Sequence, residues 1–266
     1  FEKNKVNSIE LLIMNNDIFN LKDKLIVVTG SNGQLGKSIC DYFFNLESKV
    51  IGLDLNKSNS KKLIKSYDLD IRDKDSIRLV FETIFKNYGK IDVLVNNAGV
   101  STFERFEERN EESFDWVMDI NLKGTFNCIQ NYVNLFDQNN LKKGSIINIG
   151  SIYGIISPDF RIYTDCDRKN SEVYGATKAG IIQMSKYFAV HLADRNIRCN
   201  SVSPGGIYNP KNPQGKDFIK HYSYRCPMKR MAKSDEIIGA IVYFASDISS
   251  YTTGQNLSVD GGMSSW

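Results

Sequence analysis

The sequence predicts a single α/β domain built as a doubly wound parallel sheet with helices on both faces. Short, largely apolar runs suit strands that are buried on both faces of a sheet. Five such runs occupy 25–28, 50–53, 91–95, 145–149 and 197–202. Helical patterns separate them, and strands that alternate with helices form right-handed crossover units. The 266 residues fit one large domain, and no linker or internal repeat divides them.

Four segments carry the apolar spacing of an amphipathic helix, in which buried residues recur three and four positions apart. They are 76–87, 113–135, 174–193 and 235–246. Gly89 lies just past the first of these and predicts the end of that helix, because glycine readily adopts the left-handed conformation that ends helices. Ser234 precedes the last one and is a candidate N-cap.

Composition excludes several classes of protein. Hydrophobic content of 41%, charged content of 24% and a net charge of +3 are ordinary for a globular chain, so we expect no nucleic-acid partner and no membrane association. Five scattered Cys and two His predict neither a disulfide framework nor a metal site. Residues 1–24 lack a signal-peptide pattern, and we expect a reduced, cytoplasmic protein. Residues 1–20 are predicted to be an N-terminal extension of a domain that spans 21–266.

A glycine-rich turn follows the first predicted strand and precedes a helical pattern. It reads TGSNGQLG at 29–36, with Gly30, Gly33 and Gly36. Such a turn lets the backbone approach a pyrophosphate, and the helix N-terminus adds unpaired N–H groups and partial positive charge. It predicts a Rossmann-type dinucleotide site. Asp54 ends the second strand, where a carboxylate accepts hydrogen bonds from ribose hydroxyls and repels a 2′-phosphate, so we expect NAD, with NADP less favoured.

Tyr174 and Lys178 are four residues apart on a predicted helix, so their side chains share one face. A phenol has an ordinary pKa near 10, and a neighbouring ammonium is expected to lower it toward neutral pH. Ser151 follows another strand and can hydrogen-bond a substrate oxygen as charge develops on it. Together with the glycine turn, these residues indicate hydride transfer with Tyr174 as proton donor or acceptor.

Over about 21–262 the chain resembles the short-chain dehydrogenase/reductase family. The matching pieces are TGSNGQLG at 29–36, DLDIRD around Asp70, NNAG at 96–99, INLKG around Asn121, IINIGS ending at Ser151, YGATK at 174–178, SVSPGGI at 201–207 and SVDGG at 258–262. The resemblance implies catalytic roles for Asn121, Ser151, Tyr174 and Lys178. It also implies that Asn121 holds a water linking Lys178 to solvent.

The resemblance and the glycine turn together imply a cofactor site. Asp70 and Ile71 are implied to border the adenine, Asn97 to Gly99 the ribose side, and Pro204 to Ile207 the nicotinamide carboxamide. The full predicted set is Gly30, Asn32, Gln34, Leu35, Asp54, Asp70, Ile71, Asn97, Ala98, Gly99, Tyr174, Lys178, Pro204, Gly205 and Ile207. Two residues depart from the family pattern: Gln34 stands where its main branch has Gly, and Asn209 where a Thr often contacts the cofactor.

The gap between Ser151 and Tyr174 is longer than is usual in the family. The extra segment 155–173 carries Asp159, Arg161, Tyr163, Asp165 and Arg168, and both its ends are anchored at the catalytic residues. We therefore expect it to line a polar, sugar-like substrate, with Ser151, Arg161 and Tyr174 in contact and Arg161 or Arg168 able to pair a phosphate. Residues 208–230 are predicted to form a lid.

Segments SIYGIISPDFRIY, SEVYGATKAGI and VSPGGIYNP are similar to a branch of flagellin-modification and surface-sugar oxidoreductases. That similarity suggests a role in surface-glycan or nonulosonic and amino-sugar biosynthesis. Two alternatives stay open: a 3-oxoacyl-thioester ketoreductase and a non-catalytic cofactor-binding protein. The family also commonly forms homodimers or homotetramers through the helices near 113–135 and 174–193 and the C-terminal strand, and we expect one of these assemblies.

Overall fold

The computed structural model describes residues 19–164 and 169–266, in which seven parallel strands form one sheet. The strand order is β3-β2-β1-β4-β5-β6-β7, so the chain starts in the middle and winds outward in both directions, as predicted. The strands are β1 Leu25–Thr29, β2 Lys49–Asp54, β3 Lys65–Asp68, β4 Val93–Asn96, β5 Gly144–Ile149, β6 Ile197–Pro204 and β7 Asn256–Val259.

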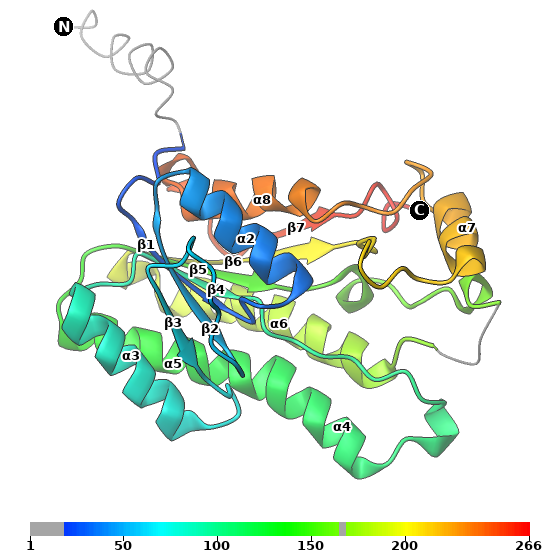
Figure 1. Cartoon of the computed structure of the whole chain (residues 1–266), viewed down its shortest axis with the longest axis horizontal. Helices are drawn as coiled ribbons and strands as arrows, with labels where there is room; N and C mark the ends of the chain where they lie inside the picture. The colour runs from blue at the N-terminus through cyan, green and yellow to red at the C-terminus, as the bar shows by residue number, and fades with distance from the viewer. Residues whose placement is uncertain (1–18, 165–168) are drawn as a thin grey trace, which may run out of the picture.

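Helices cover both faces of the sheet (Figure 1). One face carries α2 (Gln34–Asn45) and α8 (Asp235–Ala245). The opposite face carries α3 (Lys74–Tyr88), α4 (Glu111–Met118), α5 (Thr125–Gln138) and α6 (Glu172–His191). A further helix, α7 (Lys216–Arg225), lies beyond the sheet near the C-terminus. This three-layer arrangement confirms the predicted fold class.

Alternate residues of one strand serve the two hydrophobic cores, because successive side chains of a strand point to opposite faces. In β1, Leu25 and Val27 belong to the core beneath α3 and α5, whereas Ile26 and Val28 belong to the core beneath α2 and α8. All five residues of β1 are buried. The double burial explains why the run is apolar at consecutive positions.

The helix predicted over 113–135 is present, but its hydrogen bonding is not uniform along its length. The helix is interrupted between α4 and α5 by a π-helical turn, Asp119–Gly124. The side chain of Asn121 in this turn exchanges two hydrogen bonds with the backbone of Val100. The turn thus carries a tertiary contact that the spacing of apolar residues does not reveal. Two strands, β3 and β7, were not among the five predicted apolar runs. Both strands are short and their residues are partly exposed, so neither forms an apolar run.

The ends of three helices test the predicted start and stop signals. Gly89 ends α3 with φ of 74°, as predicted. The α6 helix begins two residues earlier than predicted, because Ser171 accepts a hydrogen bond from Tyr174 N and caps it. Ser234 precedes α8, but its side chain makes no capping bond and that prediction is wrong. Glu236 instead accepts from Lys233 N at 2.8 Å.

The described cysteines Cys40, Cys128, Cys199 and Cys226 are free and buried, as expected for thiols that pack as small apolar groups. Cys166 lies outside the described residues. Burial raises the pKa of the Cys40, Cys128 and Cys199 thiols to about 12, so these groups remain protonated. Among the described residues, no helix is both long and apolar enough to cross a membrane.

Candidate active site

The glycine turn between β1 and α2 is shaped by backbone crowding. Gly30 has φ of +64°, and a Cβ there would lie 2.7 Å from the Ala98 Cα. A Cβ on Gly36 would overlap the Gly30 carbonyl oxygen. Asn97 Nδ2 donates to the carbonyl oxygens of Thr29 and Gly30, each at 3.0 Å, which ties the turn to the end of β4. The turn therefore stays narrow and leaves the N-terminus of α2 accessible.

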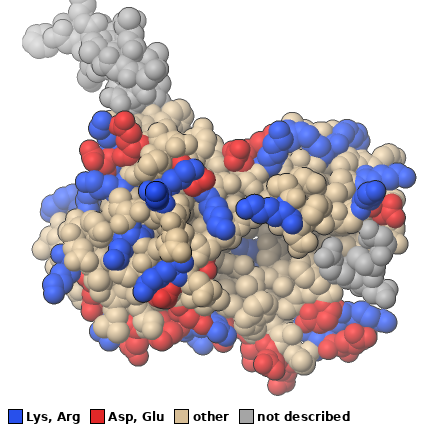
Figure 2. All heavy atoms as spheres, viewed as in Figure 1, with Lys and Arg blue, Asp and Glu red and all other residues tan. Residues whose placement is uncertain are grey.

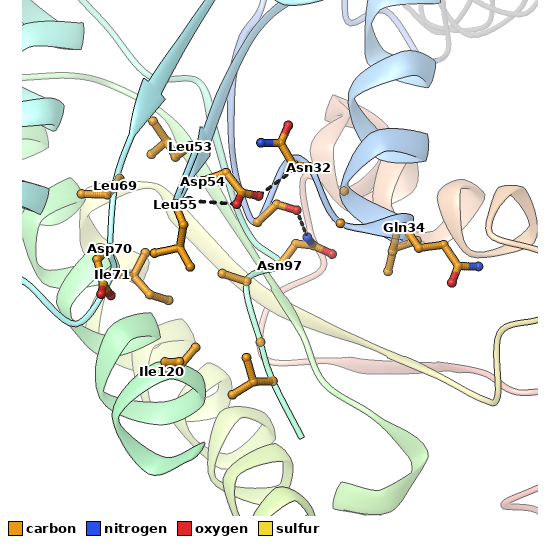
Figure 3. A pocket seen from close by; sticks show the side chains of 17 residues that line it. Asn32, Gln34, Leu53, Asp54, Leu55, Leu69, Asp70, Ile71, Asn97 and Ile120 are labelled. Carbon is orange, nitrogen blue, oxygen red and sulfur yellow. Dashed lines mark hydrogen bonds between the residues drawn. The ribbon is translucent and has the colours of Figure 1, made fainter. Parts of the chain in front are cut away.

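A cavity of about 510 Å³ opens at this turn, beside the point where the strand order reverses between β1 and β4 (Figure 3). Ligands of doubly wound sheets bind at such a reversal. Its lining includes ten of the predicted cofactor residues: Gly30, Asn32, Gln34, Leu35, Asp54, Asp70, Ile71, Asn97, Ala98 and Gly99. The glycine cradle and the lining of this cavity fit a dinucleotide.

Sequence reasoning missed five apolar wall residues of this cavity, Leu53, Leu55, Leu69, Val100 and Ile120. Four of them directly neighbour predicted cofactor residues in the sequence. Their positions near the carboxyl ends of strands could therefore have indicated that they line the cavity. Ile120 directly precedes Asn121, which was predicted for catalysis and not for the cofactor, and it reaches the cavity from the π-helical turn between α4 and α5. In Figure 3, Gln34 lies on the opposite side of the cavity from Asp70 and Ile71.

Asp54 is held in place at the carboxyl end of β2. Its Oδ2 accepts from Asn32 N and its Oδ1 from Leu55 N, both at 2.8 Å. Lys57 is the first basic residue after Asp54, and its Nζ lies 3.4 Å from Asp68 Oδ2. The Asp54 carboxylate thus lines the cavity, while Lys57, the next cation in the sequence, is paired with Asp68.

Asp70 lines the same cavity and forms a close pair with Arg72. The Arg72 guanidinium donates from Nη2 to Asp70 Oδ2 at 2.6 Å and from Nε to both carboxylate oxygens. These hydrogen bonds lower the pKa of Asp70 below its ordinary value. The carboxylate orientation is therefore fixed before any ligand arrives.

A second cavity, of about 400 Å³, contains the predicted reaction centre. Ser151 follows β5, Tyr174 lies in the first turn of α6, and both line this cavity. The Ser151 hydroxyl is close enough to the Tyr174 phenol to act on its pKa through hydrogen bonding. Ser151 Oγ also accepts from Tyr153 N at 3.1 Å, which orients the hydroxyl. The structure thus brings together two groups that can contact one substrate oxygen.

Lys178 is only 4% exposed, and its Nζ donates to the Ile149 carbonyl oxygen at 2.8 Å. Burial lowers its pKa to about 8. Nζ lies 5.5 Å from the centre of the Tyr174 ring. The expectation that Lys178 lowers the pKa of Tyr174 is wrong for the protein alone: burial raises that pKa, and the hydrogen bond with Ser151 opposes the rise.

Asn121 is completely buried beside Lys178. Its Oδ1 accepts from Val100 N at 2.8 Å, and its Nδ2 donates to Val100 O and Thr177 Oγ1. A Cβ on Gly99 would lie 3.4 Å from both Asn121 Oδ1 and Lys178 Nζ, so the two groups are close neighbours. The four predicted catalytic residues therefore form one contiguous cluster.

The segment after β6 closes the site on its other side. Gly205 lines the catalytic cavity, and its N–H donates to Val259 O at 3.0 Å. Pro204 ends β6, and Ile207 forms an isolated bridge with Ala232. Asn209 also lines the cavity, but its Oδ1 accepts from Lys211 N and Asn212 N within its own loop.

The described part of the predicted insertion, 155–164 and 169–173, lies beside the catalytic cavity. Tyr163 and Asn170 line it together with Ser151 and Tyr174. Arg161 does not join them, because its guanidinium pairs with Asp159 at 2.8 Å and its side chain is 87% exposed. Asp165 and Arg168 lie outside the described residues.

Sequence reasoning missed several residues of the catalytic cavity. They are Phe103, Ile152, Tyr153 and Met231. The other lining residues not named as site residues lie in segments that were predicted to border the site: Tyr163 and Asn170 in 155–173, Gly206 in 204–207, and Asn212, Pro213, Gln214, Phe218 and Tyr222 in 208–230. Tyr153 could have been found, because it stands two residues after Ser151 at the carboxyl end of a strand. Tyr222 and Phe218 are supplied by α7, whose position only tertiary packing sets.

Comparison with known proteins gives a consistent result. The family model described as enoyl-(acyl carrier protein) reductase matches residues 35–264. The chain is 37% identical to 3-oxoacyl-(acyl-carrier-protein) reductase FabG of Thermotoga maritima, covering 91% of this chain and 98% of that protein. It is 31% identical to post-translational flagellin modification protein A of Campylobacter coli (91% and 98%). It is 32% identical to the ribulose-forming D-arabinitol 2-dehydrogenase of Candida tropicalis (93% and 95%).

Solved structures show the same likeness. A short-chain dehydrogenase of Leptospira borgpetersenii with bound NAD⁺ superposes with a TM-score of 0.86 at 37% identity, covering 92% of this chain and 94% of that one. The aldohexose dehydrogenase of Thermoplasma acidophilum superposes with a TM-score of 0.82 at 29% identity, covering 94% and 97%. The match spans both cavities.

Proposed function

The chain belongs to the short-chain dehydrogenase/reductase family, a family of nicotinamide-dependent oxidoreductases acting on CH–OH groups, and we propose that it interconverts an alcohol and a ketone on a polar, sugar-like substrate with NAD(H). One observation carries the proposal. Ser151 and Tyr174 line one cavity, and Lys178 and Asn121 are buried beside them. That arrangement serves proton transfer at an oxygen atom.

The glycine turn and the N-terminus of α2 would hold the pyrophosphate, and Asp54 the adenosine ribose. When bound, the nicotinamide gives or takes the hydride. Tyr174 gives the proton to the substrate oxygen in reduction and takes it in oxidation, and Ser151 hydrogen-bonds the same oxygen and stabilises the charge that develops there. Lys178 lies beside Tyr174, where its amino group can exchange a proton with the phenol, and Asn121 beside it would hold a water that links Lys178 to solvent.

The preference for NAD follows from the charges around β2. A 2′-phosphate would lie against the carboxylate of Asp54, which is fixed by two backbone N–H groups. Lys57 would have to leave Asp68 before it could neutralise that phosphate. Like-charge contact in a partly buried site is unfavourable, so NAD is the better fit. The Leptospira relative binds NAD⁺, which supports this choice.

The substrate proposal rests on the polar residues that the insertion and the 208–230 segment add to the catalytic cavity. Tyr163, Asn170, Asn209 and Gln214 all line it. Relatives named for D-arabinitol and aldohexose oxidation support a polyhydroxylated substrate. The relative named for flagellin modification supports a place in the synthesis of surface sugars.

A second candidate is reduction of a 3-oxoacyl thioester. It is favoured by the 37% identity to an enzyme named for that reaction over nearly the whole chain. The two candidates differ in what the catalytic cavity must accept, an apolar acyl chain or a polyol. Activity with acetoacetyl thioesters that exceeds activity with every polyol would select the second candidate.

The experiment that tests the common mechanism replaces Tyr174 by Phe. Turnover should fall at least roughly 1,000-fold, because the proton donor is lost, while NADH binding stays nearly intact. Tyr187→Phe, on an exposed position of the same helix, is the matched control and should leave both unchanged. Retention of turnover by the Tyr174 variant would contradict the mechanism.

The experiment that tests the substrate class is a screen of aldoses, alditols, sugar phosphates and nucleotide sugars with NAD⁺ and NADP⁺. We expect turnover of at least one polyol and a higher kcat/KM with NAD⁺. Tighter binding of NADPH than of NADH would overturn the interpretation of Asp54.

A further inference from the structure

Two tyrosine hydroxyls outside the catalytic set meet at the wall of the catalytic cavity. Tyr153 follows Ser151 at the end of β5, and Tyr163 comes from the insertion between Ser151 and Tyr174. Their phenols are close enough for Tyr163 to act on the pKa of Tyr153. Both residues line the cavity that holds Ser151 and Tyr174. A pair of hydroxyls therefore lies beside the reaction centre without a role in proton transfer.

Tyr153 is fixed directly to that centre. Its backbone N–H donates to Ser151 Oγ at 3.1 Å, and its phenol is close enough to Tyr174 for the two to interact electrostatically. Burial, reinforced by the neighbouring Tyr163, raises the pKa of Tyr153 well above its ordinary value. The phenol stays neutral at any physiological pH and keeps its proton for hydrogen bonding.

Tyr163 is fixed from the other side by the predicted lid. Its ring packs on Phe218 of α7 with 5.2 Å between ring centres, and Phe218 packs on Tyr222 at 5.9 Å. The Tyr222 hydroxyl accepts a hydrogen bond from Gly206 N, in the segment after β6. This row of aromatic rings links the insertion, α7 and the segment after β6, so the Tyr163 ring has a defined place.

A rigid, neutral pair of hydroxyls suits a neutral hydroxyl on the substrate. One hydroxyl of such a pair donates to the other, and a ligand hydroxyl can join them by both donating and accepting. An acyl chain would gain nothing there and would desolvate two polar groups, which is unfavourable. The pair lies next to Ser151 and Tyr174, so the ligand group it contacts is close to the reacting carbon.

We propose that the Tyr153–Tyr163 hydroxyl pair is a specificity site that binds the hydroxyl on the carbon adjacent to the one oxidised or reduced, so that the enzyme selects α-hydroxylated substrates. The inference rests on the proposed function and makes it more specific. Tyr163 belongs to the extra segment of this chain, which explains how that segment contributes to substrate choice.

The test compares substrates that differ only in that hydroxyl. The probes are D-glucose and 2-deoxy-D-glucose, D-galactose and 2-deoxy-D-galactose in oxidation, and hydroxyacetone and acetone in reduction. The wild type should prefer the hydroxylated member of each pair it accepts. Tyr163→Phe and Tyr153→Phe should lower kcat/KM for that member by roughly 10- to 100-fold and leave the deoxy member nearly unchanged.

Tyr132→Phe is the matched control. Tyr132 is fully buried, and its hydroxyl donates to Ile91 O at 3.3 Å in the core rather than in the cavity. It should not change the ratio between the two members of a pair. Equal losses on both members in the Tyr153 and Tyr163 variants would show a structural role and overturn the proposal.

The outcomes separate the inference from the proposed function. Turnover of polyols without preference for the adjacent hydroxyl overturns the inference and leaves the function standing. Absence of turnover of every probe and of every compound in the sugar screen, with either nicotinamide, overturns both. A preference that Tyr163→Phe and Tyr153→Phe both abolish supports both.

Discussion

At the scale of single residues, Lys178 combines a charge-bearing group with nearly complete burial. It is held by one carbonyl oxygen and has a pKa of about 8 rather than the ordinary 10.5. The ammonium therefore loses its proton within a range of pH that enzymes experience. In the protein without ligands, Lys178 is poised to exchange a proton, which suits the end of a proton path next to Tyr174.

This lowered pKa makes stability depend on pH in a defined direction. Between about pH 8 and 10.5 the unfolded chain binds a proton at Lys178 and the folded protein does not, so unfolding becomes less favourable as pH rises. Relative to Lys178→Met, the free energy of unfolding of the wild type should rise by up to about 1.4 kcal/mol per pH unit in this window and stay level below it. Urea unfolding across pH measures it.

Lys186→Met is the control for this pH dependence, because Lys186 is exposed on the same helix. Its difference from the wild type should be flat across the same window. Identical slopes for the wild type and Lys178→Met would show that Lys178 is not titrating there.

The departure of Gln34 from the family pattern was visible in the sequence, but its hydrogen-bond partners were not. Gln34 Nε2 donates to Tyr208 O at 2.7 Å and to Ser234 Oγ at 3.1 Å. These partners are 174 and 200 residues away in the chain, so no local pattern could indicate them. The amide connects the glycine turn with the start of the 208–230 segment.

At the scale of elements, the turn between β1 and α2 requires a residue without a Cβ at position 36. Gly36→Ala would place a Cβ onto the Gly30 carbonyl oxygen, a backbone atom that cannot rotate away. We expect a loss of stability of about 1–3 kcal/mol and weaker NADH binding, because the turn must open. Chemical denaturation and fluorescence titration with NADH measure the two effects.

Gly239→Ala is the matched control, since Gly239 lies in α8 and a Cβ there meets nothing within 4 Å. Alanine favours the helical state by roughly 0.5–1 kcal/mol over glycine. The control should therefore be slightly more stable than the wild type and bind NADH equally well. Similar effects of the two substitutions would contradict the role given to the turn.

At the scale of the whole molecule, the faces of α4, α5 and α6 carry large apolar side chains that face solvent. They are Phe114, Trp116, Phe126, Tyr187 and Val190, of which Val190 is 82% exposed. Apolar groups gathered on neighbouring helices are typical of interaction surfaces. The face seen in Figure 2 instead shows charged residues of both signs around a hollow near its centre. We propose that the helix surface pairs with a second copy of the chain.

Val190→Glu should disrupt such an assembly, because a charge buried in an apolar interface is strongly unfavourable. We expect a shift from dimer or tetramer toward monomer in size-exclusion chromatography with light scattering, at equal protein concentration. Leu79→Glu, at an exposed position of α3, a helix that carries none of these five residues, is the control and should not change the mass. An unchanged mass for both variants would place the interface elsewhere.

The sequence by itself determined the fold class, and it predicted the glycine turn, Asp54 and the four residues proposed for catalysis. These signals are local: a strand buried on both faces is apolar at consecutive positions, a tight turn requires glycine, and two residues one helical turn apart share a face. Such constraints act within a few residues and can be seen without knowing what packs against them.

Only the tertiary structure decided which other side chains complete the site. Tyr163, Phe218 and Tyr222 come from separate segments and meet because the insertion packs against α7. Arg161 shows the converse, since a plausible substrate residue pairs with Asp159 at the surface. Burial likewise raises the pKa of Tyr174 where spacing alone predicted a lower one. Partner choice and burial depend on the whole chain, and for that reason spacing could not reveal them.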